Sequence, residues 1–132
     1  MLVFFYNREE MAVQMEEKIQ SLYEEINFIG FYCMYHKENH YIEKTAELFP
    51  DIQEFAQWFL SGNQFGIEDD LYHALQQSLI EVLKDCEEAL RERDRVLMMD
   101  ALEQGISEYL KMFLSEEYLK EKENENIRRE DS

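Results

Sequence analysis

Residues 68–94, EDDLYHALQQSLIEVLKDCEEALRERD, decide the fold class of this chain. The apolar residues of this stretch recur every three or four positions, at Leu71, Leu75, Leu79, Val82, Cys86 and Ala89. That spacing keeps side chains on one face of an α-helix. The three acidic residues at 68–70 suit a helix start, because negative charge there meets the positive end of the helix dipole. The sequence therefore predicts a long amphipathic helix.

The same period continues on both sides of this stretch. A helix is expected from Arg8 onward, with a stripe at Met11, Met15, Ile19, Leu22, Ile26, Ile29 and Cys33. A strand is the alternative over residues 27–35, because Phe, Ile and Tyr also favour strands. Asp94 is a predicted N-cap for a further helix, whose inner face is Met99, Leu102, Ile106, Tyr109 and Phe113. Gly105 within that helix suggests a close crossing of two helices.

Between these segments, residues 41–49 form a short helical segment that is expected to end at Pro50. Asp51 and Glu54 have the spacing of a capping box, which predicts a new helix start. The predicted fold is therefore all-α: an antiparallel four-helix bundle with an interrupted second helix and a charged C-terminal extension. We expect one helical domain at 1–119 and a charged, frayed or disordered tail at 120–132.

The composition limits the partners that this chain can bind. It has 132 residues, of which 30 are acidic and 13 basic, so its formal net charge is −17. Such a surface repels phosphate backbones, which argues against direct nucleic-acid binding and suits a basic protein partner. The two cysteines do not form a disulfide framework, and no apolar run is long enough to span a membrane. A cytoplasmic protein is expected.

No catalytic motif or phosphate-binding loop is found, so neither an enzyme nor a cofactor is expected. The sharpest chemical candidate is a metal site at Cys33, His36 and His40, whose spacings of three and four place them on one helix face. Thiolate and imidazole bind zinc and other transition metals, and Glu43 lies one step further along. The alternative is that the two histidines close the buried stripe near the helix C-terminus.

Residues 89–103, ALRERDRVLMMDALE, resemble a segment of uncharacterised small bacterial helical-bundle proteins. The shared pattern is an acidic residue at a helix junction, a short apolar run and then Asp-x-Leu-Glu. The similarity extends loosely over residues 40–114. It implies a bacterial origin and a helical fold, and it carries no activity.

The leading functional hypothesis is a non-enzymatic acidic interaction module, an adaptor or chaperone-like bundle that binds a protein through an apolar surface ringed by acid. Trp58, Met98 and Met112 are the predicted partner-binding residues, because aromatic and methionine side chains recur at adaptable binding surfaces. One alternative is an inhibitor that mimics nucleic acid and occupies the cleft of a DNA- or RNA-binding protein. The other alternative is a metal-binding bundle that uses Cys33, His36 and His40.

Overall fold

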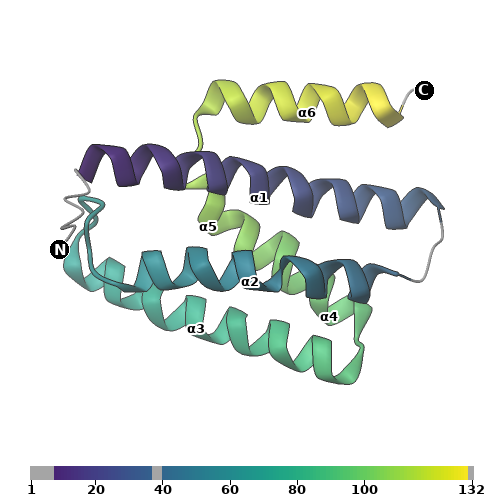
Figure 1. Cartoon of the computed structure of the whole chain (residues 1–132), viewed down its shortest axis with the longest axis horizontal. Helices are drawn as coiled ribbons and strands as arrows, with labels where there is room; N and C mark the ends of the chain where they lie inside the picture. The colour runs from purple at the N-terminus through teal and green to yellow at the C-terminus, as the bar shows by residue number, and fades with distance from the viewer. Residues whose placement is uncertain (1–7, 37–39, 131–132) are drawn as a thin grey trace, which may run out of the picture.

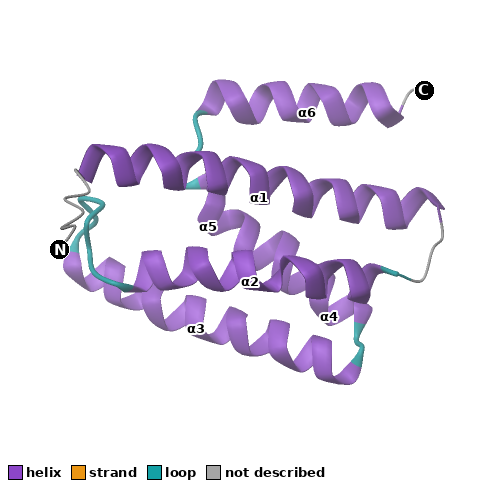
Figure 2. Cartoon of the chain, in the orientation of Figure 1, coloured by secondary structure: helices purple, strands orange, loops and turns teal. Residues whose placement is uncertain are grey.

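The computed structural model describes residues 8–36 and 40–130, with side chains at 14–32 and 40–125. The elements in chain order are α1 (Arg8–His36), α2 (Tyr41–Leu60), α3 (Asp69–Glu92), α4 (Arg95–Asp100), η1 (Ala101–Ile106), α5 (Ser107–Lys111) and α6 (Glu116–Glu130). Within these described ranges the chain has no strand (Figure 2), which confirms the all-α prediction and the helical interpretation of residues 27–35. In the same part of the chain, no helix has the length and apolar character needed to cross a membrane.

The long helices alternate in direction. In Figure 1, α1 and α2 lie side by side and run in opposite directions, and α3 reverses again below α2. The stretch from α4 through the π-helical segment η1 to α5 then crosses behind them, toward α1. The core lies between these four stretches, where Ile19, Ile26, Phe59, Leu79 and Ile106 are each at most 1% exposed.

The buried face of α3 differs from the predicted one at its first turn. Leu71 is 54% exposed, and its neighbour Tyr72 is buried instead. The Tyr72 hydroxyl donates to the carbonyl of Phe59 at 2.5 Å, and the Gln76 amide donates to the carbonyl of Leu60 at 3.4 Å. These bonds satisfy carbonyls at the end of α2 that have no partner within that helix. Tyr72 lies seven positions before Leu79, so a regular helix also places it on the buried face, where its hydroxyl caps α2.

The predicted interruption at Pro50 is not present, since α2 runs from Tyr41 to Leu60 with Pro50 inside it. Proline removes one backbone hydrogen bond and disfavours helix. Here its side chain is exposed, while Leu48 and Ile52 on either side of it are buried in the core. Packing of that apolar face outweighs the local penalty. Glu54 accordingly does not act in a capping box, and its carboxylate accepts a hydrogen bond from Lys18.

The junction after α3 follows the prediction closely. Arg93 has a left-handed backbone with φ 53°, and the Asp94 side chain accepts a hydrogen bond from the Leu97 amide at 3.0 Å, as an N-cap does. The predicted inner residue Met99 is only partly buried, while Met98 is 1% exposed. One cause is the π-helical turn at Ala101–Ile106, which shifts the helical phase between the two ends of this stretch.

Gly105 lies in that π-helical turn, against α3. A Cβ atom built at Gly105 would lie 2.7 Å from Cγ1 of Val82. The close helix crossing predicted from this glycine is therefore confirmed, and α3 is the helix that it meets.

Helix α6 lies on the side of α1 opposite α2 (Figure 1). Its described contacts with α1 centre on Glu24, whose carboxylate accepts hydrogen bonds from the Tyr118 hydroxyl at 2.5 Å and from Lys122 Nζ at 3.1 Å. The Tyr118 ring also lies 6.3 Å from the ring of Tyr23. The helix extends to Glu130, so the backbone of the predicted tail is helical as far as that residue.

Candidate interaction surface

A pocket of about 170 Å³ lies between α1 and α2. We call it the α1–α2 pocket. Its apolar floor is formed by Met15, Ile19, Leu22, Leu48 and Phe55, and its polar rim by Lys18, Ser21, Glu25, Asp51 and Glu54. The residues from each helix recur every three or four positions, so each wall is one face of a helix. The pocket therefore combines an apolar floor with a charged border.

The rim carries three carboxylates and one ammonium group. Lys18 Nζ lies 2.5 Å from Glu54 Oε1 and bridges the two helices, although both side chains are about half exposed, at 60% and 47%. The hydrogen bond to Glu54 raises the pKa of Lys18, and the charges of Glu54 and Asp51 act in the same direction. Lys18 is thus held as a cation among carboxylates, and the rim keeps a net negative charge.

The floor belongs to the folded core. Ile19, Leu22, Leu48 and Phe55 are each less than 9% exposed, so most of each side chain is packed in the core. Met15 is partly buried at one end. A floor fixed by core packing does not need to form when a ligand arrives, and this is the usual state of binding pockets.

The three predicted partner-binding residues differ in exposure. Trp58 is partly buried, with its ring centroid 4.9 Å from that of Phe65 and 5.1 Å from that of Phe113. Met98 is 1% exposed and packs in the core, so its side chain is not accessible to a partner. Met112 is 45% exposed near the end of α5. None of the three lines the α1–α2 pocket.

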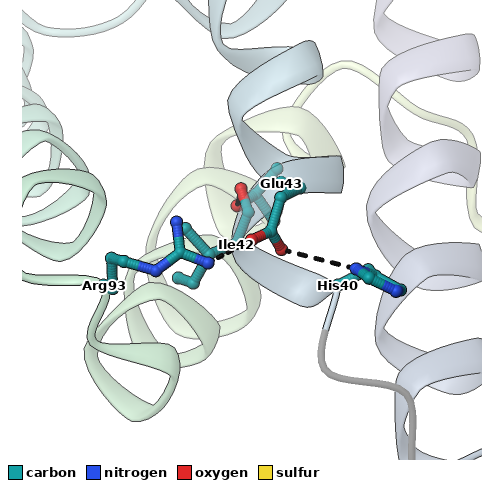
Figure 3. A network of polar contacts seen from close by, with 5 residues as sticks. His40, Ile42, Glu43 and Arg93 are labelled. Atoms are coloured by element: carbon teal, nitrogen blue, oxygen red, sulfur yellow. Dashed lines mark hydrogen bonds and ion pairs between the residues drawn. The ribbon is translucent and has the colours of Figure 1, made fainter.

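The predicted metal ligands can be placed only in part. The side chains of Cys33 and His36 lie outside the described residues. His40 is exposed, and its Nδ1 lies 4.0 Å from Glu43 Oε2 (Figure 3). No cluster of three or more His, Cys, Asp or Glu that could hold a metal ion occurs in the part of the chain whose side chains are described. The metal site stays a prediction.

Glu43 has a structural partner from another element. The Arg93 guanidinium donates a hydrogen bond to the Glu43 carboxylate (Figure 3), and this bond is the main cause of the lowered pKa of Glu43. Arg93 stands at the turn between α3 and α4, whereas Glu43 lies in the first turn of α2. The network of Figure 3 thus links the start of α2 to the turn between α3 and α4.

Sequence reasoning missed the pocket because its rim residues had ordinary local interpretations. Lys18 lies outside the predicted apolar stripe of α1, and Asp51 and Glu54 have the spacing of a capping box. One signal was available: Lys18 is the only lysine or arginine between residues 9 and 36. Its carboxylate partner comes from 36 positions further along the chain, so only the packing of α1 on α2 identifies it.

No protein-family model, curated protein or solved structure matches this chain. The resemblance of residues 40–114 to small bacterial helical proteins therefore stays a prediction.

Proposed function

We propose that this chain is a non-enzymatic, acidic protein-interaction module, an adaptor or chaperone-like bundle, that binds a segment of another protein in the α1–α2 pocket. The observation that carries the proposal is the apolar floor at Ile19, Leu22 and Phe55 bordered by carboxylates. Apolar contact supplies affinity, and negative charge speeds the encounter with a basic partner and selects for it. The net charge of −17 extends this attraction over the whole molecule.

The scaffold suits such a role. We take α1, α2, α3 and the stretch 95–111 as the four members of an antiparallel bundle, with α6 as an appended helix. Both walls of the pocket then belong to long helices anchored in one core, and sites on rigid elements keep their geometry. Cys86 is a free and fully buried thiol whose pKa is raised to about 12 by burial. A protonated, enclosed thiol is compatible with the cytoplasmic setting that belongs to this proposal.

Photo-crosslinking from the pocket rim tests the proposal. Ser21 is exposed on the rim, and Ser78 is exposed on α3, outside the pocket. A photoreactive phenylalanine at each position gives two probes that differ only in location. In lysate of the source organism, the probe at Ser21 should capture a defined protein in stoichiometric yield, and the cross-linked peptide should contain lysine or arginine. The probe at Ser78 should not capture it.

The same pair of probes separates the proposal from nucleic-acid mimicry. Ser78 shares a helix face with Glu81, Asp85 and Glu88, which form a row of carboxylates on the exposed side of α3. Capture of a DNA- or RNA-binding protein from Ser78, with nothing from Ser21, would support mimicry and contradict the pocket. Absence of any capture from Ser21 also counts against the proposed function.

A further inference from the structure

We infer that the α1–α2 pocket recognises one large apolar side chain next to a lysine or arginine, and that the partner's cation replaces Lys18 at Glu54. This inference rests on the proposed function and names the chemistry of the bound segment. Lys18 is then an internal competitor: it occupies the position of the partner's cation while the pocket is empty.

The dimensions of the pocket fix how much of a partner can enter. A cavity of about 150 Å³ is large enough to take up a benzene molecule, so the pocket, at about 170 Å³, accepts one side chain of the size of Leu, Met or Phe. Along α1 it extends from Met15 to Glu25, which at 1.5 Å per residue is about 15 Å. This length matches two to three helical turns or four to five extended residues. The ligand is therefore a short segment with a single inserted side chain.

The charges around the pocket indicate which kind of ligand residue lies next to the inserted side chain. Lys18 already shows that an ammonium group on an aliphatic stem can reach Glu54 from the opposite wall of the pocket, since its Nζ lies 2.5 Å from that carboxylate. Glu25 and Asp51 complete the rim and form no ion pair within 4.0 Å among the described residues. Glu25 and Asp51 can therefore bind a ligand cation that lies next to the inserted side chain.

The bridge from Lys18 to Glu54 can also open readily. Ion pairs between side chains that are this exposed contribute little to stability, because water screens them and holding two long side chains costs entropy. A ligand that brings its own cation restores the same bond and adds apolar contact with Leu22, Leu48 and Phe55. Exchange of one cation for another at Glu54 therefore favours the ligand.

The test begins with selection of ligands for the full chain. A phage library of random 12-residue peptides is selected against the immobilised protein, and the most enriched peptide is synthesised with a fluorophore. We expect enrichment of peptides with a large apolar residue one to four positions from a lysine or arginine. Replacing that basic residue by Gln, or the apolar residue by Ala, should each reduce binding in fluorescence anisotropy.

Variants of the protein then locate the cation. Lys18→Met keeps the aliphatic stem and removes the competing charge, so it should tighten binding about threefold, the size typical of an exposed ion pair. Glu54→Gln should weaken binding by at least about the same factor. Lys84→Met is the matched control: Lys84 pairs with Glu81 on α3, is similarly exposed and gives the same change in net charge. It should leave the affinity within measurement error of that of the unmodified protein.

Several results would overturn this inference. Selection of no peptide, or of peptides without basic residues, contradicts it directly. Equal tightening by Lys18→Met and Lys84→Met would mean that net charge alone acts, and weakening by Lys18→Met would mean that Lys18 contacts the ligand. The Ser21 photo-crosslink tests the proposed function separately. If it captures a partner while the selected peptides lack these preferences, the proposed function stands and only this inference fails. Circular dichroism confirms that each variant folds, and Lys18→Met remains informative if Glu54→Gln does not fold.

Discussion

Substitution of Gly105 by alanine should destabilise the protein, although alanine is the better helix former. Alanine gains about 1 kcal/mol over glycine inside a helix. At this position the new Cβ would lie 2.7 Å from Cγ1 and 3.1 Å from Cγ2 of Val82. Val82 is β-branched, so it has few rotamers with which to move away.

The net effect follows from the difference of these two terms. Inserting a methyl group into a well-packed contact costs about 1–3 kcal/mol, and about 1 kcal/mol of helix propensity is recovered. We expect Gly105→Ala to lower the free energy of unfolding by about 1 kcal/mol, which corresponds to a decrease in Tm of roughly 4 °C for a chain of this size. Combining it with Val82→Ala should relieve the contact, with a coupling energy on the order of 1–2 kcal/mol in the double-mutant cycle.

Gly30 is the matched control, because it is also buried in a helix and its Cβ would also meet an atom at 2.7 Å. That atom is Oε1 of Glu103, the far end of a flexible side chain that can rotate away. Gly30→Ala should therefore stabilise the protein, by up to about 1 kcal/mol. Urea denaturation followed by circular dichroism measures all four variants. Stabilisation by Gly105→Ala of the same size as by Gly30→Ala would refute the close crossing.

Three further predictions concern polar groups. Burial raises the pKa of Glu103, so the folded state binds the proton more tightly than the unfolded state does, and stability falls as pH rises from 4.5 through the raised pKa. Glu103→Gln should therefore stabilise the protein at pH 7 but not at pH 4, and equal effects at both pH values in urea denaturation would contradict this reasoning. The Ser107 hydroxyl is buried without a hydrogen-bond partner among the described residues, so Ser107→Ala should raise the unfolding free energy by about 1 kcal/mol, whereas Ser78→Ala on the surface should change it by less than about 0.5 kcal/mol in the same assay. Tyr118→Phe removes one of the two described hydrogen bonds between α6 and Glu24, so amide hydrogen exchange over residues 116–125 should accelerate while exchange in α3 is unchanged. Uniform acceleration would indicate loss of the whole fold instead.

The elements of the fold were largely predictable because their signals are local. The stripe through Ile19, Leu22 and Ile26 and the cap at Asp94 depend on residues within one or two helical turns of each other. The errors arose where distant residues decide. Tyr72 is buried in place of Leu71 at the start of α3, where its hydroxyl caps α2, and Met98 replaces Met99 in the core near the π-helical turn that changes the helical phase.

The acidic and apolar character of the candidate site was predictable from the sequence, but the residues that form it were not. Net charge and apolar content indicated an acidic border around an apolar surface, and the α1–α2 pocket has that character. The predicted residues Trp58 and Met98 belong instead to packed parts of the molecule, because a methionine or aromatic side chain has the same sequence signature in a core as at a surface. Pairing of Lys18 with Glu54 depends on how two helices pack, and spacing within either helix does not contain that information.

The continuity of α2 through Pro50 links the main correction in the fold to the proposed function. Leu48 precedes Pro50, whereas Asp51 and Phe55 follow it, and all three line one pocket. Residues three, four and seven positions apart share a face only while the helix between them is unbroken. A chain that ended one helix at Pro50 and began another at Asp51 would turn Phe55 and Glu54 away from Leu48, so neither the floor nor the bridge to Lys18 would form. The buried face of α2 therefore outweighs the local preference of Pro50 for a helix start, and the continuous helix that results forms one wall of the α1–α2 pocket.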